Sequence, residues 1–451
     1  MLANRANGST NYKYSHYMTL RIINSLAKTL LSLLLVTMTA QASAADIHYV
    51  GGDISMLDKY TEAGAIYIDG DGQVQQPLAL FSSAGWNIMR LRLFVNPENA
   101  TADDRKEGAV QDLAYVVSLG KKIKDAGFSL MLDFHYSDTW TDPGQHSTPA
   151  AWQSLSVAER TARIGTYTSE CLQAMIDGGA TPDFIQPGNE ITGGMLWPSG
   201  QVYASGGAPS GGSWDVFAGY LKSAIDACHS KCPAAKIVIH TEMHNASLVP
   251  SFYNQLAKYP EISYDIIGLS YYPDYHGTLS MLSSTLSTLE QQHSDKQIMI
   301  VETGYGFRWA IPSDKDAYKN QYPITVEGQR TFAAELISTL NAHPQVTGIV
   351  WWFPEDNLNG IVFTNGIAGD WSKKITNDYW NGSLFDQETG KANTALYELK
   401  NFIPADQQMG VSTVETQRRL SDRIYDLTGR SYDRSSAPHG IYITPRGKVI
   451  R

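Results

Sequence analysis

The stretch "DFIQPGNEITGGMLW" (183–197) lies near the middle of the chain. Phe184 and Ile185 are apolar, whereas the Gln-Pro-Gly-Asn segment that follows (186–189) contains residues that a helix disfavours. We therefore expect a short buried strand over 183–186 that ends in a loop. The first acid of that loop is Glu190, directly after Asn189, so the fold must account for a carboxylate at the end of a buried strand.

Similar apolar runs of strand length recur on both sides of this stretch, and the full set covers 47–54, 87–95, 128–134, 183–186, 236–240, 266–270, 297–301 and 346–352. Segments with helical spacing lie between them, at 113–126, 158–178, 217–227, 279–292 and 328–342, with a closing helix at 396–402. Strands that alternate with helices predict an α/β fold with a parallel sheet, and eight repeats predict a closed (β/α)8 TIM barrel with long loops after strands 7 and 8. An open, doubly wound sheet is the alternative, but no glycine-rich phosphate loop continues the first strand.

The two ends of the chain differ from this pattern. Arg21 and Lys28 precede an apolar run (29–38) and the small residues 42–44, which predicts a signal peptide over 1–45, with Met18 as an alternative start. The run is too short for a membrane span, so we expect export to the periplasm, the cell surface or the medium. Residues 46–404 then form the catalytic domain. Residues 405–451 form a linker and a short β-type tail that resembles bacterial sorting signals; a tail without a sorting role is the alternative.

Charge and cysteine content restrict the partners. The net charge is −10 with both signs spread along the chain, so the basic surface that nucleic acid requires is absent. The 25 Tyr and 10 Trp fit either core packing or flat ligands stacked on rings. Of the three cysteines, Cys228 and Cys232 are spaced for a small disulfide, and Cys171 is expected to be a free, buried thiol. No second cysteine pair completes a metal site.

Chemically useful side chains gather where the expected strands end, which is the active-site face of a (β/α)8 barrel. Glu190 ends the fourth strand and Glu302 ends the seventh. Strands 4 and 7 face one another across the barrel mouth, so these two acids can meet although they are remote in sequence. A pair of carboxyl groups, one protonated and one ionised, is what the hydrolysis of a glycosidic bond requires.

Several sequence motifs of this chain are similar to those of a known family. The chain resembles glycoside hydrolase family 53, the endo-β-1,4-galactanases, over about residues 47–402, and the resemblance is carried by "MRLRLFVNP" (89–97), "DFHYSDTWTDPGQ" (133–145), "GNEITGGMLWPSG" (188–200), "GLSYYPDYHG" (268–277), "VETGYG" (301–306) and "LFD" (384–386). The resemblance implies an enzyme that hydrolyses internal β-1,4-galactosyl bonds of galactan or type I arabinogalactan with retention. Two alternatives are a related retaining barrel acting on mannan, xylan or glucan, and a non-catalytic galactan-binding protein, although the latter is expected to lose one of the two acids.

The same resemblance implies roles for individual residues. Glu190 is expected to be the general acid/base and Glu302 the nucleophile, with Arg90 orienting Glu302. Asn189 is expected to bind the sugar 2-hydroxyl. The other residues expected to bind substrate are Asp133, His135, Asp138, Trp140, Trp197, His240, Tyr272 and Trp352. Two of these assignments have alternatives: Arg92 shares the strand face of Arg90, and Asp133 is equally suited to organising the barrel mouth.

The chain also departs from the family pattern. It reads Trp352-Phe353-Pro354-Glu355 where the family commonly has Trp-Glu-Pro, and Asp274 and His276 replace more usual aromatic or small residues. No cofactor is expected. Some bacterial members bind a structural calcium between the last two loops; three acids here are within reach in sequence (Asp370, Asp378 and Asp386), but no compact calcium loop is present, so no metal ligand is assigned. We expect a monomer.

Overall fold

The computed structural model describes residues 47–408, except 107, 204–211, 244–246, 309–319, 358 and 360–381, together with four short strands of the tail. The predicted signal peptide (1–45) lies outside the described residues. Among the helices that the structure describes, none is long and apolar enough to cross a membrane.

Eight parallel strands close into a barrel, in the order β1-β10-β9-β8-β7-β6-β5-β4 with β4 pairing back onto β1. The strands are β1 (Tyr49–Asp53), β4 (Ile88–Leu93), β5 (Ser129–Phe134), β6 (Phe184–Pro187), β7 (Lys236–Glu242), β8 (Ile266–Tyr271), β9 (Gln297–Thr303) and β10 (Val346–Trp352). Each lies within a few residues of a predicted strand. The predicted (β/α)8 barrel is therefore confirmed, and the open-sheet alternative is wrong.

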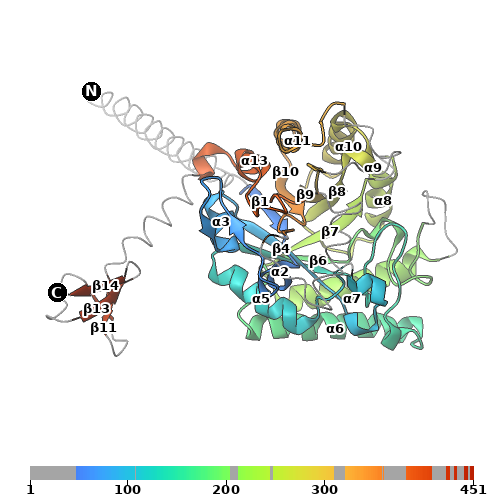
Figure 1. The fold of residues 1–451 in the computed structure, drawn as a ribbon. Helices are drawn as coiled ribbons and strands as arrows, with labels where there is room; N and C mark the ends of the chain where they lie inside the picture. The colour runs from blue at the N-terminus through green and yellow to red at the C-terminus, as the bar shows by residue number, and fades with distance from the viewer. Residues whose placement is uncertain are drawn as a thin grey trace, which may run out of the picture. The chain divides into compact units, whose positions relative to one another are not determined.

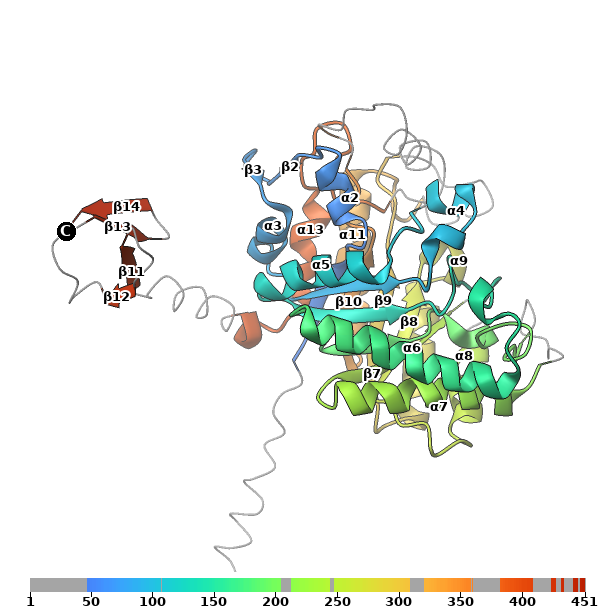
Figure 2. The same ribbon diagram turned by 90° about the horizontal axis from the view of Figure 1, so that it is seen from below.

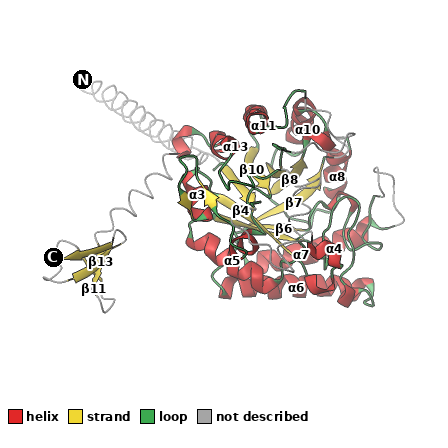
Figure 3. Ribbon diagram, viewed as in Figure 1, coloured by secondary structure: helices red, strands yellow, loops and turns green. Residues whose placement is uncertain are grey.

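Helices surround the strands, as Figure 3 shows in red around yellow. The longer ones are α5 (Leu113–Asp125), α6 (Val157–Asp177), α7 (Trp214–Lys231), α8 (Leu248–Leu256), α10 (Leu279–Gln292) and α11 (Val326–Leu340). The predicted closing helix is α13 (Thr394–Glu398), continued by the 3-10 turn η5 (Leu399–Phe402). Helices α6 and α7 run side by side (Figures 1 and 2). Helix α8 was not predicted from the sequence.

Shorter elements fill the connections. They are α2 (Leu57–Glu62), α3 (Pro77–Ser83), α4 (Ala102–Lys106) and α9 (Pro273–His276), the 3-10 turns η1 (Pro97–Asn99), η2 (Ala150–Trp152) and η3 (Ile191–Gly193), and the hairpin β2 (Tyr67–Ile68) and β3 (Val74–Gln75). In the tail, β11 (Arg423–Asp426), β12 (Ser431–Asp433), β13 (Ile441–Thr444) and β14 (Gly447–Ile450) form an antiparallel sheet in the order β12-β11-β13-β14.

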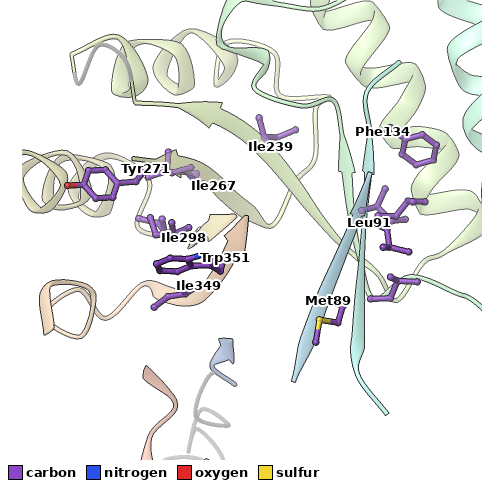
Figure 4. Close-up of a cluster of buried hydrophobic side chains, with 14 of the residues drawn as sticks. Met89, Leu91, Phe134, Ile239, Ile267, Tyr271, Ile298, Ile349 and Trp351 are labelled. Atoms are coloured by element: carbon purple, nitrogen blue, oxygen red, sulfur yellow. The ribbon is translucent and has the colours of Figure 1, made fainter. Parts of the chain in front are cut away.

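The barrel strands divide their side chains between two apolar layers because successive residues of a strand point to opposite faces. The inner layer fills the barrel and contains Ile88, Met131, Phe184, Val238, Ile266, Met299, Val301 and Val350. The outer layer packs between strands and helices, and Figure 4 shows members of it such as Met89, Leu91, Ile239 and Ile349. Because Ile88 points inward, Arg90 and Arg92 on the same strand point inward as well.

All three cysteines are buried and free in the structure. Cys171 lies on α6, Cys228 on α7, and Cys232 at the end of α7. Burial raises the pKa of Cys228, which favours the neutral thiol. The free, buried thiol expected at Cys171 is observed, whereas Cys228 and Cys232 do not form the expected disulfide in this structure.

Candidate active site

A cleft of about 490 Å³ opens at the carboxyl ends of the strands. Eight of the residues predicted from the sequence line it: Arg90, His135, Trp140, Asn189, Glu190, Tyr272, Glu302 and Trp352. The predicted pair of acids therefore does converge in one cavity, and both side chains are largely buried there.

Glu190 adopts a backbone conformation that ordinary residues avoid. Its φ and ψ angles are 49° and 47°, in the left-handed region, where it caps the 3-10 turn η3. Two histidines hold this backbone: the Glu190 N–H donates to His240 Nδ1 at 3.2 Å, and His146 Nε2 donates to the Glu190 carbonyl at 3.2 Å. The turn thus redirects the side chain of Glu190 at the point where strand β6 ends.

Glu302 reaches the cleft through a β-bulge in β9. In the pairing with β8, Leu269 is opposite Ile300 but the next residue, Ser270, is opposite Glu302, so Val301 is an extra residue. Pairing with β10 shows the same irregularity, because Ile349 is opposite Ile300 and Trp351 is opposite Thr303. Regular alternation after the outward Ile300 would turn Glu302 away from the barrel interior. The bulge restores its inward direction.

Three side chains fix the carboxylate of Glu302. Arg90 Nη2 lies 2.9 Å from Glu302 Oε1. The Tyr272 hydroxyl donates to Oε2 at 3.3 Å, and the Ser270 hydroxyl donates to the same oxygen at 3.5 Å. A cation and two hydroxyl donors favour the ionised form of this carboxyl group.

Arg90 is the centre of the polar network, and it is almost completely buried. Its guanidinium donates to Asp53 Oδ2 at 2.8 Å, to Asp133 Oδ2 at 2.9 Å and to Asn189 Oδ1 at 2.9 Å. Five donors in a rigid plane allow one arginine to orient several acceptors at once. Arg90 therefore fixes Asn189 and Glu302 relative to each other.

A second layer of hydrogen bonds lies beneath the cleft. His240 Nδ1 accepts from the Glu190 N–H and from Gln186 Nε2, the latter at 2.8 Å. With Nδ1 an acceptor, Nε2 carries the proton and donates to the Ser270 hydroxyl at 2.8 Å. Burial and the nearby Arg90 cation lower the pKa of His240, so this ring is neutral. Through His240 and Ser270, the backbone N–H of Glu190 is thus connected to the carboxylate of Glu302, and Gln186 holds His240 from the other side.

The electrostatic environments of the two acids differ. Burial, the charge of Glu302 and, more weakly, Glu242 and Asp142 raise the pKa of Glu190 well above its usual range. Burial also raises the pKa of Glu302, to about 7, but the Arg90 cation and the Tyr272 hydroxyl oppose that rise. Glu302 is consequently the stronger acid of the pair. Glu302 therefore ionises first as the pH rises, while Glu190 keeps its proton.

Four predicted binding residues lie behind the cleft wall instead of lining it. Asp133 and His240 are fully buried, and each contacts only protein groups among those described above. Asp138 accepts hydrogen bonds from Asn96, Asn99 and Ala150, and so ties loops together. Trp197 packs against His146 and donates from its indole to the Gly193 carbonyl. None of the four is among the residues that line the cleft, and a direct contact of these side chains with substrate stays a prediction.

Arg92 packs against the aromatic part of the cleft wall, which is formed by Trp140 and Phe353. Its guanidinium carbon lies 4.5 Å from the centre of the Trp140 ring and 4.9 Å from that of Phe353, and Nη1 pairs with Asp53 Oδ1 at 3.0 Å. Arg92 therefore positions Trp140, whereas Arg90 contacts Glu302. Phe353 has a φ of 58° and directly follows Trp352. The departure of this chain from the Trp-Glu-Pro pattern thus places a ring against the second arginine.

Sequence reasoning missed several residues that the structure brings to the site. Asp53, Gln186, Ser270 and Glu242 occupy inward positions of their strands, and strand alternation is the signal that identifies them. Loop residues carry no such signal. The cleft-lining residues that were not considered are Asp104, Thr141, Asp142, Gln145 and Tyr275; Arg92 on β4, considered only as the alternative to Arg90, lines the cleft as well.

The residues considered for calcium are only partly described. Asp370 and Asp378 lie outside the described residues. Asp386 accepts from the Thr389 hydroxyl at 2.8 Å and pairs with Arg308 at 3.5 Å, so its carboxylate is engaged in a turn and an ion pair. Within the described part of the chain, no group of three His, Cys, Asp or Glu side chains is arranged to hold a metal ion.

A closed (β/α)8 barrel whose cleft holds two buried carboxyl groups of unequal acidity defines a glycosidase of the paired-carboxylate class. Comparison with known proteins agrees. The model of glycosyl hydrolase family 53 matches residues 49–400, and the chain belongs to that family.

Individual relatives resemble it over most of their length. The probable arabinogalactan endo-beta-1,4-galactanase A of Aspergillus fumigatus is 31% identical over 77% of this chain and 96% of that protein. Among solved structures, the family 53 catalytic domain of Ignisphaera aggregans is 30% identical with a TM-score of 0.68, covering 81% of this chain and 98% of that one. A fungal beta-1,4-galactanase is 27% identical with a TM-score of 0.64, covering 78% and 99%.

Proposed function

We propose that this enzyme hydrolyses internal β-1,4-galactosidic bonds of galactan and type I arabinogalactan with retention of anomeric configuration. The observation that carries the proposal is the asymmetry of the acid pair: Arg90 contacts Glu302 directly, whereas Glu190 has no described cation beside its carboxyl group. The galactan specificity is supported by the names of the relatives given above.

In the first step, the ionised Glu302 attacks the anomeric carbon. The bond from that carbon to the leaving oxygen breaks, and Glu190 gives its proton to this oxygen. The product is a galactosyl ester on Glu302 and a shortened chain with a free hydroxyl. Asn189, held by Arg90 at 2.9 Å and donating to the Thr141 carbonyl at 2.7 Å, is oriented to meet the sugar 2-hydroxyl.

In the second step, Glu190 is ionised and takes a proton from water. The water oxygen attacks the anomeric carbon, the ester bond breaks, and Glu302 leaves as a carboxylate. The switch of Glu190 from acid to base follows from the electrostatics. The ester carries no charge, so the main repulsion that raises the pKa of Glu190 disappears while the intermediate exists.

Replacing the nucleophile tests the assignment. Glu302→Gln keeps the size and the donors around the side chain but removes the attacking charge, so galactan turnover should fall by more than about a thousandfold. Binding of galacto-oligosaccharide, measured by calorimetry, should persist. A variant that retains substantial turnover would show that Glu302 is not the nucleophile.

Substrate class is tested by digestion of galactan, mannan, xylan and glucan, with the products sized by chromatography. We expect short oligosaccharides from galactan and none from the other three. Release of products from another polymer but not from galactan would identify a different glycanase. Binding of galactan without any product would identify a binding protein.

We further propose that residues 1–45 direct export to the periplasm, the cell surface or the medium and that 405–451 act as a sorting tail behind a catalytic domain of 46–404. The apolar run (29–38) and the small residues 42–44 support a cleavage site near Ala44 or Ala45. N-terminal sequencing of the exported protein tests this. We also propose a monomer, which gel filtration with light scattering can test.

A further inference from the structure

The segment that follows β6 (188–201) carries Glu190 on an irregular backbone. Glu190 has a φ of 49° and Leu196 a φ of 50°, so two residues other than glycine lie in the left-handed region within seven positions. Such a backbone costs free energy and persists only where the surrounding structure holds it. The direction of the Glu190 side chain therefore depends on contacts that come from outside this segment.

His146, in the loop after β5 (135–148), makes one of these contacts. Its Nε2 lies 3.2 Å from the Glu190 carbonyl oxygen. A carbonyl oxygen can only accept a hydrogen bond, so Nε2 carries a proton and donates it. The side chain of His146 is buried, and burial lowers its pKa to about 3, so the imidazole ring is neutral at the pH of the reaction. The donor is thus fixed in one tautomer.

Trp197 joins the same two loops. Its backbone N–H donates to the His146 carbonyl at 2.8 Å, and the centroids of the two rings lie 5.4 Å apart. The indole N–H donates to the Gly193 carbonyl at 3.1 Å, and the Thr148 hydroxyl donates to the Trp197 carbonyl at 3.0 Å. His146 is therefore held in place by the segment that it supports, and neither His146 nor Trp197 is among the residues that line the cleft.

His146 differs from His240 because it contacts only one of the two acids. His240 accepts from the Glu190 N–H, but its Nε2 also donates to Ser270, whose hydroxyl donates to Glu302. Within the described part of the chain, no hydrogen bond or ring contact joins His146 to Glu302. A change at His146 should consequently disturb the general acid and leave the nucleophile in place.

We propose that His146 is a positioning residue for the general acid/base: it holds the Glu190 carbonyl and thereby the direction of the Glu190 side chain. The inference rests on the proposed function, in which Glu190 gives a proton to the leaving oxygen and later takes one from water. Proton transfer requires the carboxyl group within hydrogen-bond reach of that oxygen, and a misplacement of about 1 Å costs up to about a hundredfold in rate. Without the His146 donor, the steps that move a proton through Glu190 slow down, whereas attack by Glu302 continues.

The test compares two β-galactobiosides that differ only in the leaving group, with the full-length enzyme. Phenolate needs a proton to leave, whereas 2,4-dinitrophenolate is stable without one, so the second substrate forms the Glu302 ester without help from Glu190. His146→Phe keeps a ring beside Trp197 but removes the N–H. Its kcat/KM should fall about ten- to hundredfold with phenyl galactobioside and with galactan, but less than about threefold with the dinitrophenyl substrate.

Azide gives a second measurement on the dinitrophenyl substrate. Hydrolysis of the ester needs Glu190 as the base, so this step should limit kcat in His146→Phe. Azide attacks the anomeric carbon without losing a proton, the ester bond to Glu302 breaks, and galactobiosyl azide is formed. Azide should therefore raise the kcat of the variant more than that of the unmodified enzyme, and chromatography should show the azide product.

Two further variants make the result specific. His146→Gln keeps an N–H donor at a similar distance from the backbone and should retain most of the activity with both leaving groups. His229→Phe removes a comparable hydrogen bond on α7, from Nε2 to the Ser263 carbonyl at 3.4 Å, outside the cleft lining, and should change no measurement.

The possible outcomes separate the two proposals. If His146→Phe lost both activities equally or lost neither, or if His146→Gln behaved like His146→Phe, the positioning role would be wrong while the proposed function stands. If the unmodified enzyme cleaved neither galactan nor either galactobioside, the proposed function itself would fail.

Discussion

Arg90 and Arg92 show how two identical residues on one strand face acquire different tasks. Both point into the barrel from β4, and both pair with Asp53. Arg90 continues to Asp133, Asn189 and Glu302, whereas Arg92 lies between the rings of Trp140 and Phe353. The two arginines are two residues apart on β4, which is one repeat of the strand. This shift is enough for Arg90 to contact the nucleophile while Arg92 supports the aromatic side chains of the cleft wall.

Tyr272 gives a prediction at the same scale. Its hydroxyl donates to Glu302 and lowers the pKa of that carboxyl group. Tyr272→Phe removes the donor but keeps the ring, so the pKa of Glu302 should rise and the acidic limb of the kcat/KM profile should move to higher pH. At the optimum, kcat/KM should fall roughly tenfold, as expected for one hydrogen bond to a charged group. A pH–rate profile with galactan checks both, and an unmoved acidic limb would contradict the assignment of that limb to Glu302.

Among the elements, β9 and β6 do most to place the acids. The bulge in β9 turns Glu302 inward, and the left-handed turn after β6 redirects Glu190. These irregularities need regular neighbours to maintain them, and the close packing of the other barrel strands provides that support.

The close packing between β1 and β4 leads to a prediction about stability. A Cβ added at Gly51 would lie 1.6 Å from the Ile88 carbonyl oxygen, so Gly51→Ala forces two paired strands apart. The free energy of unfolding should fall by about 3 kcal/mol or more. The matched control is Gly219→Ala on α7, where nothing lies within 4 Å, and this change should stabilise by up to about 1 kcal/mol. Urea unfolding followed by circular dichroism measures both, and equal midpoints would refute the packing argument.

At the scale of the whole molecule, the segment after β10 joins the two ends of the barrel domain. Glu355 Oε1 accepts from the Met56 N–H at 2.9 Å, and the Tyr67 hydroxyl donates to the Glu355 carbonyl at 2.7 Å. Tyr60 donates to the carboxyl group of Asp356. Both acids are fully buried, and burial raises their pKa values, that of Asp356 to about 8. Neutral carboxyl groups thus anchor the last barrel loop to the first helix.

The buried Asp356 predicts how stability depends on pH. Its pKa is raised in the folded state, so the folded protein retains a proton that the unfolded chain releases near pH 4. Its contribution is therefore fully present at low pH and is lost as the pH rises from about 4 to 8. Asp356→Asn removes this titration, so the loss of unfolding free energy between pH 5 and pH 8 should be about 1–3 kcal/mol smaller than in the unmodified protein.

Urea midpoints at the two pH values measure the difference. The surface change Asp125→Asn, which removes a carboxylate paired with Lys121, serves as the control and should leave the dependence on pH close to that of the unmodified protein. An undiminished loss of stability in Asp356→Asn would show that this carboxyl group is ionised in the folded protein.

Strand alternation and strand count were sufficient to predict the barrel and to place Glu190 and Glu302 at its mouth, whereas Arg90 was assigned from the resemblance to family 53. These features follow from the regular spacing of apolar residues along the chain, which can be recognised in a single sequence. The bulge at Val301, the left-handed Glu190, the chain from Gln186 to Ser270 and the position of Tyr275 were decided only by the tertiary structure. The reason is that each depends on contacts between strands or loops that are remote in sequence. Such contacts produce no regular spacing of residues that could be recognised in the sequence.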